Sequence, residues 1–330
     1  MELADLVLEL LGVSGSRGAG AEGRPGRGFL SAFVGAGGKT TALYALAEEL
    51  AGRGERVLVS TTTKIYDPRV EGPRPLARIE LAPELAPQTG PNAGSGAAAS
   101  AEPAGALTAA PSGLDAARAA ALDRIRALAS PGKIVLLAAE SLPDEGKLRG
   151  LAPEALCALA GAFDHVLVEA DGARRLPVKA PGPDEPVVPL CADLVVGCVG
   201  LDCLGRNIGP GTVHRSELFA PLVGALAGEP ITASRLARLA AAPEGLFKAA
   251  PPGARRLVAL NKAELLPSER LEELLDFFAQ EGLQAREAPR TNSERPPIAD
   301  AVACCSFAAP SGRILALLRL TPHPGLRRIY

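Results

Sequence analysis

A glycine-rich turn between an apolar segment and a helix constrains this chain more than any other feature. Residues 33–41 have the sequence FVGAGGKTT in one-letter code. Residues 28–34 are apolar and suit a strand, and residues 40–51 place leucine and alanine on one face of a helix. Glycines let backbone N–H groups converge on phosphate oxygens, and the start of a helix adds partial positive charge. The run therefore predicts a phosphate-binding loop.

The same residues predict that the chain binds a nucleoside triphosphate, either ATP or GTP. Lys39 is expected to reach the terminal phosphates, and the Thr40 hydroxyl to bind Mg²⁺. The residues expected to contact the nucleotide here are Gly35, Ala36, Gly37, Gly38, Lys39, Thr40 and Thr41. The alternative, a glycine turn with an incidental lysine, requires several independent features to coincide.

The loop departs from the usual pattern G-x-x-x-x-G-K-[ST] at one position. Phe33 stands five residues before Gly38, where that pattern has a glycine. The shorter sequence G-x-x-G-K-T-T resembles the loop of the Mur ligases. It is also similar to a tightened form of the loop in signal-recognition and partition ATPases.

Composition sets the broad class of the protein. The chain has 330 residues, of which 47% are hydrophobic, and a formal net charge of −2. This length suits one large or two smaller domains, and the charge argues against nucleic acid as a partner. Residues 1–13 lack the features of a signal peptide, and no apolar run is long enough to span a bilayer. We expect a soluble cytoplasmic protein with no membrane partner.

The six cysteines show no metal-binding pattern. None forms a C-x-x-C pair, so structural zinc is not expected, and we expect the cysteines to be reduced. The adjacent Cys304 and Cys305 are the one pair for which a thiol or metal role stays open.

Alternating apolar segments predict an α/β fold with a mostly parallel sheet flanked by helices, as in P-loop NTPases. Further strands are expected at residues 56–60, 133–138, 165–168, 193–199 and 256–260, and helices at 2–12, 114–128 and 153–160. Residues 81–113 are rich in Ala, Pro and Gly and are predicted to form a disordered insertion.

Three regions follow from this pattern. Residues 1–28 are expected to form an N-terminal helix and a Gly/Arg-rich connector, and 29–265 a nucleotide-binding domain. Residues 266–330 are expected to form an extension packed on the same domain.

A second motif, with two acidic residues, follows the segment 165–168. Glu169 and Asp171 come directly after this apolar strand, with Ala170 between them. P-loop proteins hold Mg²⁺ with a carboxylate at such a strand end, and strand alternation puts both side chains on one side. We expect Glu169, Asp171 or both to bind the metal and to act in catalysis. By itself, the pattern also fits a solvated turn.

Two further segments lie at predicted strand ends. Thr61, Thr62 and Thr63 precede Lys64; Thr62 is a catalytic candidate and Lys64 a candidate for substrate or partner contact. Threonine is also simply a good strand residue. Residues 261–264 have the sequence NKAE, similar to the N-K-x-D motif with which GTPases read guanine. Base contact is expected from Asn261, Lys262 and Glu264, although chance occurrence and adenine remain open.

Proline-rich segments follow the acidic strand end. Residues 177–189 contain P-V-K-A-P and E-P-V-V-P, and V-H-R stands at 213–215. Their rigid backbone could present four side chains to a substrate or partner: Lys179, Glu185, His214 and Arg215. A His-Arg pair is more often a surface feature at the start of a helix.

Taken together, these blocks resemble the YqeC family of selenium-dependent hydroxylase accessory proteins. The resemblance rests on V-G-A-G-G-K-T-T, T-T-T-K-I, G-K-L-R-G-L, V-E-A-D-G-A, P-V-K-A-P, E-P-V-V-P, V-H-R and N-K-x-[DE], in order over residues 34–264. It implies a P-loop nucleotide-binding protein that helps to mature selenium-dependent molybdenum hydroxylases. The implied partner is such a hydroxylase or its molybdenum cofactor.

Three functions remain open from the sequence. The first is a nucleotide-hydrolysing maturation factor, which the base-reading motif favours. The second is a small-molecule kinase or ATP-dependent ligase, which the Mur-like loop favours, with an acceptor held by Lys179, His214 and Arg215. The third is a cofactor scaffold that binds nucleotide without turnover.

Overall fold

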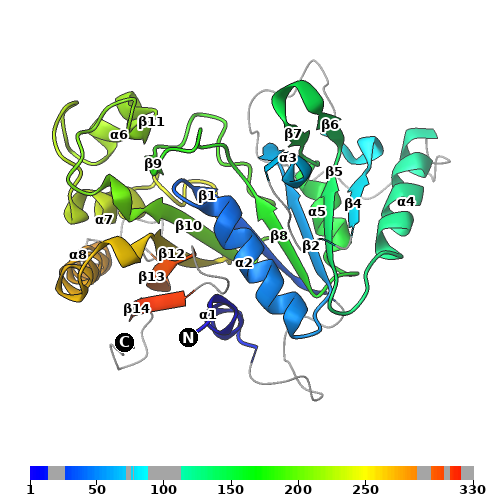
Figure 1. The fold of residues 1–330 in the computed structure, drawn as a ribbon, viewed down its shortest axis with the longest axis horizontal. Helices are drawn as coiled ribbons and strands as arrows, with labels where there is room; N and C mark the ends of the chain where they lie inside the picture. The colour runs from blue at the N-terminus through cyan, green and yellow to red at the C-terminus, as the bar shows by residue number, and fades with distance from the viewer. Residues whose placement is uncertain are drawn as a thin grey trace, which may run out of the picture.

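A nine-stranded sheet forms the centre of the computed structural model (Figure 1). The structure describes residues 1–13, 27–71, 76, 78–87, 113–287, 299–307 and 313–320. The strand order is β14-β13-β12-β10-β1-β8-β2-β5-β4, and every neighbouring pair is parallel except β13–β14. The strands are β1 Phe29–Gly35, β2 Val57–Thr61, β4 Arg78–Leu81, β5 Ile134–Ala138, β8 His165–Glu169, β10 Leu194–Gly200, β12 Arg255–Asn261, β13 Ala301–Ser306 and β14 Arg313–Arg319.

Helices cover both faces of this sheet. One face packs against α1 and α2, and the other against α4, α5, α7 and α8. The helices are α1 Leu3–Leu10, α2 Lys39–Gly52, α3 Pro68–Glu71, α4 Gly113–Arg126, α5 Pro153–Leu159, α6 Ser216–Leu222, α7 Ala233–Ala241 and α8 Ser268–Glu287. Short 3₁₀ helices lie at η1 Pro83–Leu85, η2 Pro143–Glu145, η3 Leu201–Cys203 and η4 Ala263–Leu265. The predicted α/β class with a mostly parallel sheet is confirmed.

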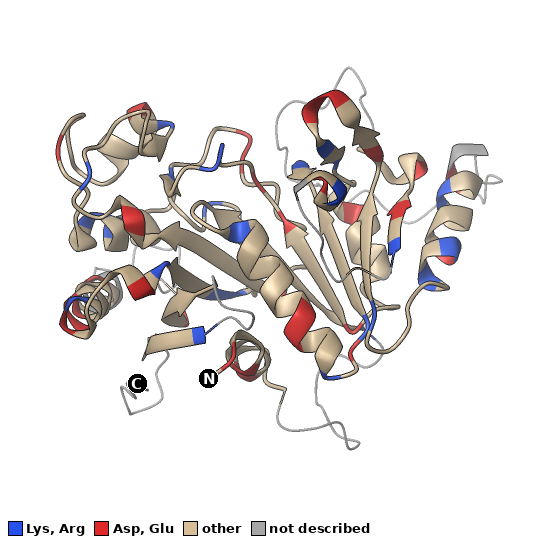
Figure 2. Cartoon of the chain, viewed as in Figure 1, with Lys and Arg blue, Asp and Glu red and all other residues tan. Residues whose placement is uncertain are grey.

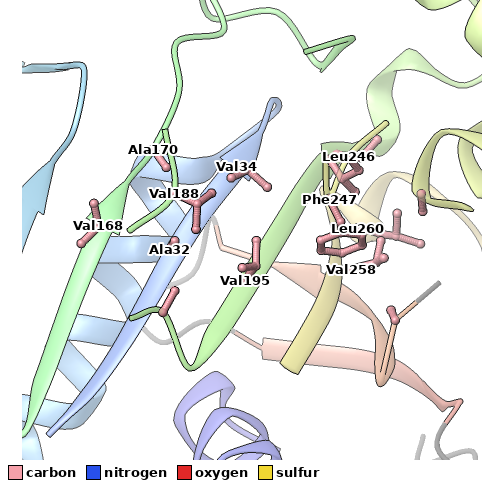
Figure 3. Close-up of a cluster of buried hydrophobic side chains, with 14 of the residues drawn as sticks. Ala32, Val34, Val168, Ala170, Val188, Val195, Leu246, Phe247, Val258 and Leu260 are labelled. Atoms are coloured by element: carbon pink, nitrogen blue, oxygen red, sulfur yellow. The ribbon is translucent and has the colours of Figure 1, made fainter. Parts of the chain in front are cut away.

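The central strands are apolar because they are buried on two sides. Along β1, Ala32 and Val34 face the cluster under α5 and α7, and Phe33 faces α2. Figure 3 shows Ala32 and Val34 in one buried cluster with Val168 of β8 and Val195 of β10. Charged residues gather on the outer helices and at strand ends, leaving most of the central sheet uncharged (Figure 2). Polar groups in the middle of the fold are therefore concentrated at the ends of the strands.

Two smaller sheets stand near the carboxyl ends of β1, β2 and β8. One contains β3 Lys64–Tyr66, β7 Lys147–Arg149 and β6 Glu140–Leu142 in that order, with antiparallel pairing. The other pairs β9 Val178–Lys179 with β11 Val213–His214 in parallel. In Figure 1 they lie on the two sides of the turn between β1 and α2.

The predicted disordered insertion begins too early. Leu81 ends β4, and the 3₁₀ helix η1 follows it with Leu85 fully buried. The backbone carbonyl of Leu85 also accepts a hydrogen bond from Ala152 N, at 2.9 Å. Residues 81–87 are therefore ordered, which corrects the prediction for this part. Residues 88–112 of the insertion and 14–26 of the predicted connector lie outside the described residues.

The cysteines also differ from expectation. Cys157 and Cys191 form a disulfide with Cα atoms 5.9 Å apart, so the prediction of a fully reduced chain was wrong. The spacing of the cysteines in the sequence does not predict this disulfide, because Cys157 and Cys191 stand 34 positions apart and are brought together only by the packing of α5 against the segment before β10. Cys304 and Cys305 alternate along β13 into opposite faces of the sheet, where burial raises the pKa of both thiols. Neighbours in sequence thus do not form one reactive pair.

Among the described residues, no helix combines the length and the apolar character needed to cross a bilayer. The cytoplasmic location stays a prediction.

Candidate phosphate-binding site

The turn between β1 and α2 is held by contacts that only glycine allows. Gly37 has a φ of +73°, and a Cβ atom there would lie 2.2 Å from Gly200 N and 2.5 Å from Pro177 O. The turn is thus seated directly against the end of β10 and the segment that leads into β9. A larger residue at position 37 would push these segments apart.

The backbone N–H groups of the turn fall into two sets. Those of Gly35, Ala36 and Gly37 donate to Asp171 Oδ2, Cys198 O and Leu176 O, at 3.1, 2.9 and 3.0 Å. Within the part of the chain that the structure describes, the N–H groups of residues 38–41 donate to no protein acceptor. These four groups lie at the start of α2, where orphan donors and the helix dipole favour an anion. Of residues 35–41, which were predicted to contact phosphate, only residues 38–41 therefore have backbone N–H groups that could donate to it.

Lys39 is buried between two carboxylates. Its side chain is 4% exposed, and Nζ lies 3.2 Å from Asp171 Oδ1 and 3.9 Å from Glu169 Oε1. Nζ also donates to Gly35 O at 2.8 Å. Burial acts to lower the pKa of Lys39, but Asp171 and Glu169 outweigh it and the pKa is raised. The lysine is therefore a fixed cation at the helix N-terminus.

Thr40 and Glu169, which were each predicted to bind Mg²⁺, are hydrogen-bonded to one another. The Thr40 hydroxyl donates to Glu169 Oε2 at 2.7 Å. The pairing of β1 with β8 places Phe33 beside Glu169, so the carboxylate at the end of β8 stands next to the loop. The structure thus brings together Lys39, Thr40, Glu169 and Asp171, as the sequence predicts.

From Asp171, a chain of opposite charges runs towards the β9–β11 pair. Lys179 Nζ lies 3.0 Å from Asp171 Oδ2 and 2.7 Å from Glu185 Oε2, and Arg215 lies 2.7 Å from the same Glu185 oxygen. Burial acts to raise the pKa of Glu185, but hydrogen bonds from Arg215 and Lys179 leave it lowered. Burial, together with Arg215, Lys179 and Arg174, lowers the pKa of His214. Lys179, Glu185 and Arg215 therefore form one network with the loop residues, in which Lys179 is buried and Glu185 and Arg215 are partly exposed.

The three threonines at residues 61–63 differ in their contacts. The Thr61 and Thr62 hydroxyls donate to Glu169 O and Val187 O, both at 2.7 Å, and so connect β2 to neighbouring segments. Thr63 and Lys64 line the cavity above the loop, whereas Thr62 does not. Thr62 thus has a structural contact, and its predicted catalytic role gains no geometric support.

The base-reading motif is placed at the loop itself. Asn261 Nδ2 donates to Gly37 O at 2.9 Å, and Asn261 Oδ1 accepts from Phe307 N at 3.3 Å. Lys262 Nζ lies 2.6 Å from Asp202 Oδ2. Asn261 and Lys262 line the cavity, but Glu264 is exposed on η4 and does not. Asn261 therefore braces the loop, and contact of Glu264 with a base stays a prediction.

All these elements surround a cavity of about 910 Å³. Its lining contains seven cations and two carboxylates: Lys39, Lys64, Lys147, Arg174, Arg175, Arg215 and Lys262, with Glu169 and Glu185. The rest of the lining includes Thr63, Tyr66 and His214. In a chain with a net charge of −2, this concentration of positive charge favours a polyanionic ligand.

Four lining residues with charged or aromatic side chains were not among the sequence candidates: Tyr66, Lys147, Arg174 and Arg175. Lys147 lies in G-K-L-R-G-L, and the two arginines follow V-E-A-D-G-A directly. The first block was noted only for the family resemblance, and the second also for Glu169 and Asp171, so proximity to these blocks was the available signal.

A family model described as YqeC protein matches residues 31–217, more than half of the chain. The chain belongs to the YqeC family. The Escherichia coli (strain K12) protein YqeC is 31% identical over 245 residues, which cover 74% of this chain and 78% of that protein. No solved structure gives a significant match. The YqeC match includes the loop, the charge network as far as Arg215 and the four added lining residues, but ends before Asn261.

Proposed function

We propose that this YqeC-family chain binds a nucleoside triphosphate with Mg²⁺ and hydrolyses it. The observation that carries the proposal is the set of four backbone N–H groups at residues 38–41, with no protein acceptor among the described residues, beside the buried Lys39. Such donors at a helix N-terminus suit phosphate oxygens. Lys39 would exchange part of its contact with Asp171 and Glu169 for the terminal phosphates.

The side chains present fit Mg²⁺ held jointly with phosphate. The described residues contain no group of three or more His, Cys, Asp and Glu side chains that could form a metal cage. Mg²⁺ at nucleotide sites needs only one or two carboxylates in addition to phosphate and water. Thr40 and Glu169 would hold the ion, and Asp171, whose Oδ1 is paired with Lys39, would be a candidate ligand only if that pair opened. The ion would neutralise charge on the phosphate oxygens.

The remaining groups would keep the site in place. Asn261 holds the carbonyl of Gly37, so the loop keeps its N–H groups directed to one point. Lys179 holds Asp171, which in turn receives the N–H of Gly35. Glu169, which lines the cavity together with His214, is the candidate group to orient an attacking water, whereas Asp171 does not line the cavity. The contacts described above select neither base, so ATP and GTP both remain within the proposal.

For the cellular role, we propose that turnover supports maturation of selenium-dependent molybdenum hydroxylases in the cytoplasm. The resemblance of the sequence blocks to accessory proteins of this kind supports this role. A client hydroxylase or its molybdenum cofactor would then be the partner, and nucleic acid would not be.

A second candidate function has one structural observation in its favour. The cavity continues beyond the loop to cations on β3 and β7, so it can accept more than a nucleotide. A small-molecule kinase or ligase would need such an acceptor region.

Phosphate release from ATP and from GTP tests the proposal. With Mg²⁺, Lys39→Ala should reduce the rate by about 100-fold or more, because a cation beside the transferred charge is lost. Thr40→Val, which removes only the hydroxyl bonded to Glu169, should also reduce it. Lys133→Ala is the matched control, since Lys133 is exposed just before β5 at the opposite edge of the sheet. Equal rates in Lys39→Ala and wild type, with both proteins folded by circular dichroism, would contradict hydrolysis at this loop.

A further inference from the structure

A second group of cations lines the cavity away from the phosphate loop. Lys64 and Tyr66 belong to β3, Lys147 to β7, and Arg174 and Arg175 to the segment after β8. In the order of the central sheet, β2 and β8 lie on one side of β1, and β10 and β12 lie on the other. The group therefore stands on the side opposite Asn261, the last residue of β12, and Lys262, which follows it. We call Lys64, Lys147, Arg174 and Arg175 the second basic group.

An aromatic ring organises part of this group. The guanidinium carbon of Arg175 lies 4.2 Å from the centre of the Tyr66 ring, and Lys147 Nζ lies 5.4 Å from the same point. A ring attracts a cation through its quadrupole but carries no net charge. Tyr66 thus contacts both cations without adding a negative charge of its own. A carboxylate in the same position would cancel their positive charge.

The lysines of the group share one carboxylate. Glu145 Oε1 lies 2.7 Å from Lys64 Nζ, and Glu145 Oε2 lies 3.7 Å from Lys147 Nζ. Glu145 does not itself line the cavity. The positive charge of the second basic group thus faces the cavity, and the negative charge of Glu145 lies behind it.

The arginines adopt an uncommon backbone conformation. Arg174 and Arg175 have φ values of +49° and +60°, in the left-handed region that non-glycine residues rarely occupy. Consecutive residues in such a conformation persist where the surroundings fix them, as at ligand-binding turns. Here the turn brings two adjacent guanidinium groups to the lining of one cavity. Guanidinium groups bind phosphate oxygens through paired hydrogen bonds.

The size of the cavity allows two ligands. Its volume of about 910 Å³ is at the upper end of the range of about 300–1,000 Å³ that is usual for small-molecule sites. A triphosphate on residues 38–41 would occupy the part beside α2. The space between the second basic group and the loop would remain.

We propose that the second basic group binds a phosphorylated small molecule beside the nucleotide. Its phosphate would be held by Lys147 and Arg175, positioned by Tyr66, together with Arg174 and Lys64. The ligand's position beside the nucleotide rests on the proposed function, whereas anion binding by the group does not. The site thus takes two phosphate-bearing ligands, one on the loop at residues 38–41 and one on the second basic group.

Calorimetric titration with inorganic pyrophosphate tests this site. The protein is first saturated with Mg²⁺ and a non-hydrolysable triphosphate analogue, so that the loop is filled. Pyrophosphate should bind wild type, and Lys147→Ala and Arg175→Ala should each weaken its binding at least tenfold. Arg149→Ala is the matched control, because Arg149 lies on the same strand and pairs with Glu140 outside the cavity. Equal binding by all four proteins would overturn the proposal.

Two further arms separate the possible sources of phosphate. If the nucleotide's own phosphates contact the second basic group, bound analogue will abolish pyrophosphate binding, and a second ligand is excluded. The same titration on nucleotide-free Lys39→Ala removes the contribution of the Lys39 cation. Binding that depends on Lys147 in that variant supports the second site even if the loop binds no nucleotide. Absence of such binding overturns it, whatever the loop does.

The role of Tyr66 has its own readout. Tyr66→Phe keeps the ring and should bind pyrophosphate as wild type does. Tyr66→Leu removes the ring face that contacts Arg175 and should weaken binding about tenfold. Wild-type affinity in Tyr66→Leu would overturn the positioning role.

Discussion

Replacing Asp171 by asparagine should destabilise the fold strongly, because Asp171 separates two buried cations. Its side chain is 1% exposed, and the side chains of Lys39 and Lys179 are 4% and 1% exposed. The carboxylate oxygens lie 3.2 Å from Lys39 Nζ and 3.0 Å from Lys179 Nζ. Asp171→Asn keeps the shape of the side chain and removes only the charge. The buried network then carries one uncompensated positive charge.

The magnitude follows from these distances. At an effective dielectric constant of about 20, each contact contributes about 5 kcal/mol of Coulomb attraction, before the cost of removing the charges from water. Removal of one member of a buried ion pair usually costs about 3–5 kcal/mol. We therefore expect the free energy of unfolding of Asp171→Asn to fall by about 3–5 kcal/mol.

Urea unfolding at pH 7, followed by circular dichroism, measures this loss. Asp164→Asn is the matched control: Asp164 precedes the same strand, β8, and pairs with Arg56, which is 37% exposed. That variant should lose about 1–2 kcal/mol. The double variant Asp171→Asn/Lys179→Met should lose less free energy of unfolding than the two single variants together, because it no longer contains the Lys179 cation that Asp171→Asn leaves unpaired. A loss below about 1 kcal/mol for Asp171→Asn, typical of a solvated pair, would refute the buried network.

Two further predictions concern α2 and the loop. Burial raises the pKa of Glu49 from 4.5 to about 7. Between pH 4.5 and pH 7 the folded chain therefore keeps the proton of Glu49 while the unfolded chain loses it, so the free energy of unfolding falls as pH rises through this range. In urea unfolding at pH 8, Glu49→Gln should be more stable than wild type by about 1 kcal/mol, a value reduced to allow for the partial solvent exposure of Glu49. At pH 4 the two proteins should be equally stable. Equal stability at pH 8 would contradict the prediction. Gly37→Ala should weaken triphosphate binding at least tenfold by calorimetry, since its Cβ would lie 2.2 Å from Gly200 N. Gly54→Ala, with a φ of +85° and nothing within 4 Å of its Cβ, should retain wild-type affinity; equal weakening in both would assign the effect to backbone strain alone.

The local part of the site was predictable from the sequence. The glycine turn, Lys39 and Thr40 are adjacent in the chain, and a strand followed by a helix fixes their arrangement. Glu169 and Asp171 were predictable because two residues at the end of a parallel strand fall at the edge where β1 also ends. The structure brings these residues together, and their role in nucleotide binding stays a prediction.

The contacts that the sequence did not reveal are those between distant segments. Asp171 contacts Lys179, and Lys179 and Arg215 share Glu185, only because the two-residue strands β9 and β11 pair above the sheet. No periodicity marks so short a pairing.

Similarly, Tyr66, Lys147 and Arg175 come from three separate segments whose contact depends on β3 pairing with β7. Leu85 shows the same limit, since an isolated leucine among Ala and Pro becomes ordered only when η1 packs against α4 and the α5 segment. The composition of a segment does not show which distant segments it contacts.

Equilibrium binding of a non-hydrolysable triphosphate analogue is the most direct test of a phosphate-binding loop at residues 35–41. Calorimetry with Mg²⁺ compares ATP and GTP analogues, and the corresponding diphosphates, on wild type and Lys39→Ala. The account predicts that wild type binds a triphosphate more tightly than its diphosphate, and that Lys39→Ala loses this preference. Unchanged triphosphate affinity in folded Lys39→Ala, or no binding to wild type, would contradict the account.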